Sequence, residues 1–180
     1  MKENLKIVVV ALILFAAFSV WNARLIEAKQ NEGSIGREAK EEILWLGRVI
    51  YSETKEENEQ VLIAWVVRNR VETGYRGKTY SEVANSPGQF SGLNAFDGQY
   101  LHNISREYGS RGEAWEKSLA IAEAVYNSPG FLRPFPQSVR HFYSPKSVSV
   151  HPEWSASYKP TFVAKDGRGG IRFAFYDSLK

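Results

Sequence analysis

The chain has 180 residues, 43% of them hydrophobic and 13% aromatic, so it can form one compact domain with a packed core. It contains no cysteine, which excludes disulfide frameworks and cysteine-ligated metal sites. The net charge of +3 and the pI of about 9.0 suit an anionic polymer or surface. No run of Lys and Arg is long enough for a nucleic-acid-binding arm, so we do not expect nucleic acid as a partner.

The first thirty residues carry a targeting signal. Lys2 and Lys6 precede an uncharged apolar run over 7–21, which lies in length between a signal-peptide core and a minimal membrane span. No small-x-small cleavage site follows, which favours an uncleaved anchor over a removed signal peptide. The lysines should stay inside, so the rest faces the periplasm or the exterior. We assign 1–28 to a signal peptide or membrane anchor containing a hydrophobic helix, 29–37 to a polar linker, and 38–180 to one exported domain.

Hydrophobic periodicity predicts three longer helices in the exported part. The first covers Glu38–Ser52 and the second Glu57–Glu72, which is apolar nearly all round and should therefore be central. Thr79 and Glu82 have the spacing of a capping box and predict a short helix. The third long helix covers 112–127 and ends before a Pro-Gly pair.

The pattern changes towards the end of the chain. The segment VRHFYSP is short and typical of a strand. Runs of β-branched and aromatic residues then flank Asp166-Gly167 and Gly169-Gly170, which predicts a hairpin. Helices followed by a small antiparallel sheet indicate an α+β fold.

A carboxylate follows the first predicted helix. Glu53 lies about one turn beyond Ile50, at the negative end of the helix dipole and beside apolar residues. Both surroundings raise the pKa of a carboxyl group, and a raised pKa is what a general acid near neutral pH needs. An ordinary exposed glutamate at a helix end is the alternative on this pattern alone.

No second carboxylate is obvious, although glycosidases commonly use two. Glu56, Glu57 and Glu59 lie in a charged stretch that is more simply a solvated connection, and Asp97 lies in a loop. One carboxylate is sufficient where a hydroxyl of the substrate itself is the nucleophile.

Several motifs follow one another in a fixed order: LGRVIYSE, AWVVRNRV, SPGQFSG, RHFYSP and PEWS. Over residues 43 to about 176 this ordered set resembles the SleB/CwlJ-type cell-wall hydrolase family. The resemblance implies a compact α+β domain related to lysozyme-like lytic transglycosylases, which acts on peptidoglycan glycan strands. It implies that Glu53 protonates the oxygen between N-acetylmuramic acid and N-acetylglucosamine. The C6 hydroxyl of the muramic acid would then close on C1 to give a 1,6-anhydro end.

The resemblance implies further residues that bind the substrate or brace the site. They are Asn69, Arg70, Gln89, Phe90, Ser91, His141, Tyr143 and Trp154. Core packing is the favoured role for Trp154. The family often has Gly-x-His-x-Phe-Tyr near its end, whereas this chain has Phe173 at the His position. We expect a monomer without cofactor or metal, with glycan strands as partner and membrane contact through the N-terminal segment if it stays uncleaved.

Three alternatives remain open. A metal-dependent peptidase would need His102, His141 and His151, but no H-E-x-x-H spacing occurs. A non-catalytic peptidoglycan-binding or assembly module could keep the same fold. Within the enzyme interpretation, a hydrolytic muramidase competes with the transglycosylase.

Overall fold

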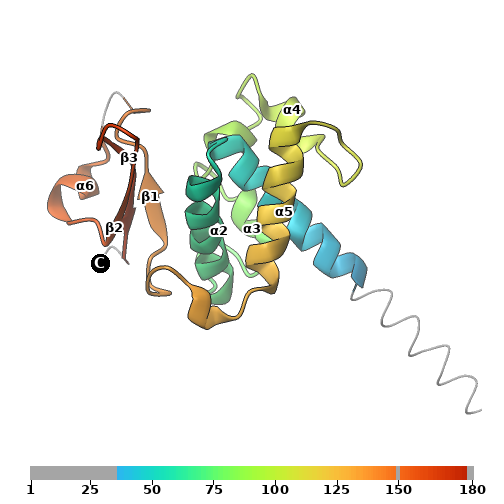
Figure 1. The fold of residues 1–180 in the computed structure, drawn as a ribbon, viewed down its shortest axis with the longest axis horizontal. Coiled ribbons are helices and arrows are strands. Elements are labelled where there is room, and N and C mark those ends of the chain that lie inside the picture. Colours follow the sequence, from blue (N-terminus) through green and yellow to red (C-terminus); the bar gives the residue numbers. More distant parts are fainter. Residues whose placement is uncertain (1–35, 149–150, 178–180) are drawn as a thin grey trace, which may run out of the picture. The chain divides into compact units, whose positions relative to one another are not determined.

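The structure, a computed structural model, describes residues 36–148 and 151–177. A helix over residues 36–53 is followed by α2 (Glu57–Glu72), α3 (Tyr80–Ala84), α4 (Tyr100–Ile104) and α5 (Glu113–Asn127). Short 3-10 turns occupy Ser91–Leu93 and Gly130–Leu132. The last part contains β1 (His141–Tyr143), α6 (Glu153–Ser157), β2 (Phe162–Lys165) and β3 (Ile171–Tyr176). Helices followed by a small sheet confirm the predicted α+β class (Figure 1).

Helix α2 is the centre of the helical part. It packs beside α5 and also contacts α3 and β1 (Figure 1). Residues 63–67 are all buried, so every face of the helix is covered along this stretch. This agrees with its nearly all-round apolar sequence, because a helix that is hydrophobic on all sides must be enclosed by other elements.

The sheet has three antiparallel strands in the order β1-β3-β2. Phe175 on the central strand pairs with Phe142 on one side and with Phe162 on the other. Its ring is fully buried and stacks on Phe135 with the ring centroids 5.8 Å apart. The sheet is therefore fastened to the core by aromatic packing, which an isolated three-stranded sheet would lack.

Local signals set the helix ends. The Thr79 side chain accepts a hydrogen bond from the Glu82 N–H at 3.1 Å, as a capping residue does. Gly74 ends α2 with φ +66°, and the next N–H, of Tyr75, donates to the carbonyl of Arg70 at 2.8 Å. Such a left-handed residue after a helix is most readily a glycine.

The predicted segments 1–28 and 29–37 lie almost entirely outside the described residues, so their assignment stays a prediction. Among the helices of residues 36–148 and 151–177, none has the length and apolar character that a membrane crossing needs.

Candidate active site

Glu53 is the last residue of the first helix and is partly buried. Burial raises the pKa of its carboxyl group from 4.5 to about 7, and the positive charge of Arg70 opposes this rise. Within the described part of the chain no hydrogen bond or ion pair holds this carboxyl group. A free carboxyl group with a pKa near neutrality can give up its proton and take it back, as general acid-base catalysis requires.

Arg70 is the charged group that acts on Glu53. Its side chain is only 3% exposed and lies over the rings of Phe90 and Phe142. Nε donates to the carbonyl of Arg140 at 2.8 Å, whereas Nη1 is buried without a partner among the described residues. Burial lowers the pKa of Arg70 to about 10, so it still carries its charge at neutral pH.

One cavity of about 430 Å³ opens at Arg70, and we call it the Arg70 cavity. It brings together five of the residues predicted from the sequence with five others. Its lining consists of Arg70, Tyr75, Arg76, Gly88, Gln89, His141, Phe142, Tyr143, Pro152 and Trp154. The cavity therefore joins α2, the loop after α3, the first strand and α6.

The aromatic wall of the Arg70 cavity is closely packed. Trp154 lies edge-on to Tyr143 and Tyr176, with ring centroids 5.6 and 4.9 Å apart, and it is partly exposed. Trp154 therefore packs against the sheet and also faces the cavity. Burial, followed by the charges of Arg70, Arg140 and Arg76, lowers the pKa of His141 to about 4, so this ring is neutral at neutral pH.

A second cavity, of about 300 Å³, lies beside Ser52, and we call it the Ser52 cavity. Its lining consists of Tyr51, Ser52, Lys55, Ser91, Gly92, Asp97, Gln99, His102 and Asn103. Gly92 presses against the end of the first helix, because a Cβ at this position would lie 2.9 Å from Cβ of Ser52. The position is therefore restricted to glycine by close approach.

The loop 88–92 separates the two cavities. Gly88 and Gln89 line the Arg70 cavity, whereas Ser91 and Gly92 line the Ser52 cavity. Phe90 lies between these pairs and is buried under Arg70. Glu53 lines neither cavity, but it follows Ser52 of the Ser52 cavity in the chain and is within electrostatic reach of Arg70 of the Arg70 cavity.

Two predicted residues, Asn69 and Phe90, are almost wholly buried. Asn69 is 0% exposed, and its Nδ2 donates to the carbonyls of Val139 at 2.8 Å and Pro136 at 3.3 Å. Phe90 is part of the core. Asn69 therefore has the contacts of a bracing side chain, and the ring of Phe90 is covered, whereas an exposed ring was expected in the groove.

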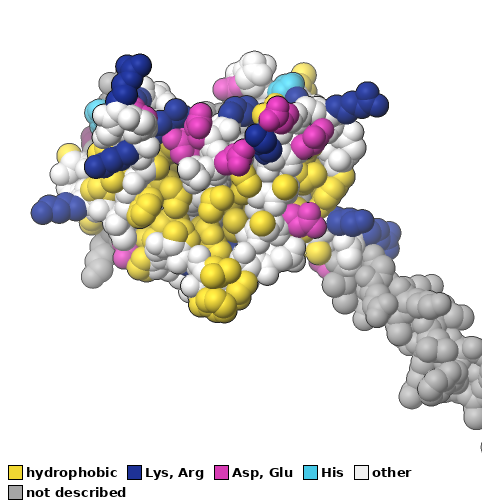
Figure 2. Space-filling view, in the orientation of Figure 1, with side chains coloured by type: hydrophobic (Ala, Val, Ile, Leu, Met, Phe, Trp, Pro, Cys, Tyr) yellow, Lys and Arg dark blue, Asp and Glu magenta, His cyan; other side chains and the backbone are white. Residues whose placement is uncertain are grey.

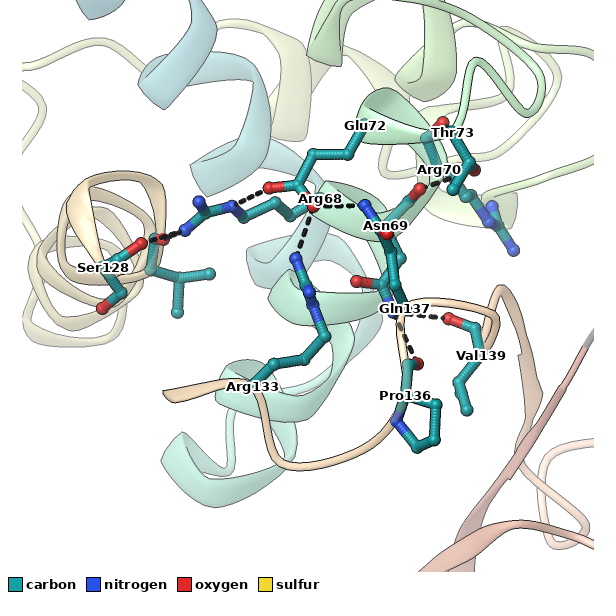
Figure 3. A network of polar contacts seen from close by, with 11 residues as sticks. Arg68, Asn69, Arg70, Glu72, Thr73, Ser128, Arg133, Pro136, Gln137 and Val139 are labelled. Carbon is teal, nitrogen blue, oxygen red and sulfur yellow. Dashed lines mark hydrogen bonds and ion pairs between the residues drawn. The ribbon is translucent and has the colours of Figure 1, made fainter. Parts of the chain in front are cut away.

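A polar network surrounds Asn69 and fixes the end of α2 (Figure 3). The carboxylate of Glu72 binds Arg68, Arg133 and Gln137. Arg68 also donates to the carbonyl of Ser128, at the end of α5, at 2.6 Å. These contacts tie α2 to α5 and to the segment leading into β1, so they hold Arg70 and His141 in one arrangement.

The four alternative carboxylates, Glu56, Glu57, Glu59 and Asp97, lie in different surroundings. Glu59 is 5% exposed and forms an ion pair with Arg172 at 2.7 Å, while Glu57 pairs with Lys117 at 3.0 Å. Glu56 and Glu59 line a further cavity of about 480 Å³ against the hairpin, which is larger than the Arg70 and Ser52 cavities but contains neither Arg70 nor Ser52. Asp97 alone of the four lines the Ser52 cavity.

Several lining residues were not anticipated from the sequence. Tyr75 and Arg76 follow the end of α2, and Arg76 has φ +71°, a strained value for a residue other than glycine. Tyr51, near the end of the first helix, lines the Ser52 cavity, and its hydroxyl lies 3.2 Å from Nε2 of His102. The turn-like string GYRGK was the only sequence signal for Arg76.

The histidines do not form a metal centre in the described residues. His102 lines the Ser52 cavity and His141 the Arg70 cavity, and neither is joined by a group of carboxylates. No cluster of three or more His, Asp or Glu side chains in residues 36–148 and 151–177 could hold a metal ion.

Comparison with known proteins identifies one family. A model of the Cell Wall Hydrolase family matches residues 54–168, well over half of the chain. The match begins one residue after Glu53. It includes every residue that lines the Arg70 and Ser52 cavities except Tyr51 and Ser52 of the first helix. No curated protein and no solved structure matches the chain. The match over the helices, the 88–92 loop and the first two strands shows that this chain belongs to the cell wall hydrolases of the SleB/CwlJ type, whose substrate is the peptidoglycan outside the cytoplasm.

Proposed function

We propose that this cell wall hydrolase cleaves glycan strands between N-acetylmuramic acid and N-acetylglucosamine as a lytic transglycosylase, with Glu53 as the only catalytic carboxyl group. The observation that carries the proposal is the partly buried Glu53, with a pKa raised to about 7, next in the chain to Ser52 of one cavity and within electrostatic reach of Arg70 of the other. A glycan strand must extend to both sides of its scissile bond, and the proposal assigns its two parts to these two cavities.

The reaction begins with a proton transfer. The protonated carboxyl group of Glu53 gives its proton to the glycosidic oxygen, and the bond from this oxygen to C1 of the muramic acid breaks. The electron pair stays on the oxygen, which leaves as the hydroxyl of N-acetylglucosamine, and positive charge develops at C1. The ionised Glu53 then takes the proton of the C6 hydroxyl while the oxygen of this hydroxyl bonds to C1. The enzyme regains its starting state and no water is consumed.

Arg70 stabilises the ionised intermediate state of Glu53. Its charge lowers the carboxyl pKa against the effect of burial, and its buried Nη1 has no partner within the described residues. A buried donor without a partner is costly, and an ionised carboxylate nearby reduces this cost. Arg70 therefore limits the pKa of Glu53 to a value from which the proton can still leave.

One observation favours a hydrolytic muramidase as the second candidate. Asp97 lines the Ser52 cavity, and its Oδ1 accepts a hydrogen bond from the N–H of Gln99 at 2.7 Å. A second carboxylate near the acid could activate water or stabilise the charge at C1. The hydrogen bond to Gln99 orients this side chain along its own loop, which is why we prefer the mechanism with one carboxylate.

The product ends distinguish the two reactions. We expect the full chain to release muropeptides from purified sacculi that end in anhydromuramic acid, lighter by one water than the hydrolytic product in mass spectra. Glu53→Gln should reduce the rate by at least about a thousandfold, because it removes the transferable proton. Asp97→Asn should retain most of the activity.

Other outcomes would favour the alternatives. Reducing muramic acid ends, together with loss of activity in Asp97→Asn, would establish the muramidase. If neither the wild type nor Glu53→Gln released soluble fragments but both bound sacculi equally, the chain would be a wall-binding module.

A further inference from the structure

The loop between the Ser91–Leu93 turn and α4 presents an unusually exposed aromatic ring. Phe96 is 98% exposed, although burial of a phenylalanine side chain favours folding. The loop is held in shape from within, since the N–H of Phe96 donates to Oδ1 of Asn94 at 3.1 Å. The N–H of Asp97 donates to the carbonyl of Asn94 at 2.8 Å. The ring is therefore held outward by a defined turn.

Phe96 forms part of the wall of a third cavity, of about 380 Å³, which we call the Phe96 cavity. This cavity shares Gly88 with the Arg70 cavity, and the same loop supplies Asp97 and Gln99 to the Ser52 cavity. The stretch 88–100 thus borders all three cavities. The Phe96 cavity is continuous in the chain with the candidate active site and extends the surface available to a strand.

The lining of the Phe96 cavity differs chemically from that of the other two. It contains no charged side chain, and its polar groups are the amides of Asn85 and Asn94 and the hydroxyls of Ser86 and Tyr100. The Arg70 cavity, in contrast, has two arginines, and the Ser52 cavity contains Lys55 and Asp97. A neutral lining with a few amides and hydroxyls and the rings of Phe90, Phe96 and Tyr100 selects an uncharged ligand that has both an apolar face and hydrogen-bonding edges.

We infer that the Phe96 cavity is an additional subsite for an uncharged sugar of the glycan strand, an N-acetylglucosamine unit, which stacks on the ring of Phe96. One face of a pyranose ring carries C–H groups and covers an aromatic ring, while its hydroxyl and acetamido groups reach the neutral amides and hydroxyls. Muramic acid carries an acidic lactyl group or a peptide, which suits the two charged cavities better. This inference rests on the proposed function of the chain.

A second exposed phenylalanine provides a matched control. Phe131 is 84% exposed in the turn after α5, where Figure 2 shows hydrophobic side chains at the surface, and it lines none of the three cavities. Both rings are almost fully solvated, so neither contributes much to folding, and removing either should leave the melting temperature nearly unchanged.

The test measures binding to full-length Glu53→Gln protein, in which strands stay uncut. The probe is peptide-free glycan strands from purified sacculi, with binding followed by calorimetry. Adding Phe96→Ala should weaken binding about tenfold, because stacked apolar area is lost. Phe96→Trp should restore it, and Phe131→Ala should bind like the parent. A shorter probe, the tetramer of N-acetylglucosamine, should show the same loss.

The outcomes separate this inference from the proposed function. If Glu53→Gln binds strands and Phe96→Ala binds them equally well, the subsite does not exist while the active site stands. If the Phe131→Ala loss equals the Phe96→Ala loss, the effect is general hydrophobic adhesion and the inference fails. If the parent protein binds no strands at all, both proposals fail together.

Discussion

Two glutamates in one short stretch of the chain show how surroundings decide the role of a carboxyl group. Glu59 is buried with a hydroxyl from Thr54 at 2.6 Å and the guanidinium of Arg172 at 2.7 Å, so its charge is compensated. Glu53 is partly buried without such partners among residues 36–148 and 151–177, and the pKa of its carboxyl group is raised to about 7. The prediction of a solvated connection is wrong for Glu59, because its partner Arg172 comes from the last strand and no local pattern shows this contact.

At the residue scale, we predict that Arg70 controls the alkaline side of the activity profile. The acid must be protonated, so kcat/KM should fall above about pH 7. In Arg70→Gln the positive charge that lowers the pKa of Glu53 is lost. The alkaline limb of the profile, where kcat/KM falls, should therefore move to higher pH by about 0.5–1 unit. Measurement of kcat/KM on solubilised glycan strands from pH 5 to pH 9 checks this.

Arg68→Gln provides the matched control for this experiment. Arg68 lies on the same helix but binds Glu72 and the end of α5, so its loss should lower stability without moving the alkaline limb. An unchanged limb in Arg70→Gln, or an equal movement in both variants, would contradict the assigned role of Arg70.

At the scale of elements, the local sequence predicted the long helices but not the cavities. Glu57–Glu72 and the end of α5 at Asn127 agree with the periodicity and the breakers that follow. The short helices α4 and α6 were not predicted, because five residues are too few to show a period. The Arg70 cavity depends on α2, β1 and α6 packing together, and no local pattern contains this information.

Also at this scale, we predict that Gly92→Ala separates the Ser91–Leu93 turn from the first helix. The added Cβ would lie 2.9 Å from Cβ of Ser52 and 3.1 Å from Nδ2 of Asn103, so one of the elements must move. We expect a loss of about 1–3 kcal/mol in unfolding free energy and a lower rate of sacculus clearing. Urea unfolding and a turbidity assay measure the two effects.

Gly98→Ala serves as the comparison, since a Cβ there has no atom within 4 Å. It belongs to the same loop region and should change neither stability nor clearing appreciably. Equal behaviour of the two variants would show that the contact between Gly92 and Ser52 does not position the site.

For the whole molecule, the raised pKa of Glu53 must appear in the pH dependence of stability. The fold favours the protonated form, so this group's stabilisation is complete below about pH 4.5 and is lost as the pH rises through about 7. Glu53→Gln cannot titrate. Relative to this variant, the wild type should therefore lose on the order of 1–3 kcal/mol of unfolding free energy between pH 4.5 and pH 8.

His141 acts in the opposite direction and is present in both proteins. Its lowered pKa makes its contribution complete above about pH 6.5, and this contribution is lost as the pH falls through about 4. Subtracting the unfolding free energy of Glu53→Gln from that of the wild type at each pH cancels the contribution of His141. A difference that stays constant from pH 4 to pH 8 would mean that the fold does not shift the pKa of Glu53.

The order of the strands has a consequence for when the enzyme can first act. The central strand β3 follows β1 and β2 in the chain, so neither of the earlier strands has a neighbour to pair with until β3 has been synthesised. His141 and Tyr143 belong to β1 and form one wall of the Arg70 cavity. A partly made chain on the ribosome therefore carries Glu53 without the complete wall of the Arg70 cavity. If this cavity binds the glycan as proposed, wall-degrading activity arises only after nearly the whole domain has emerged.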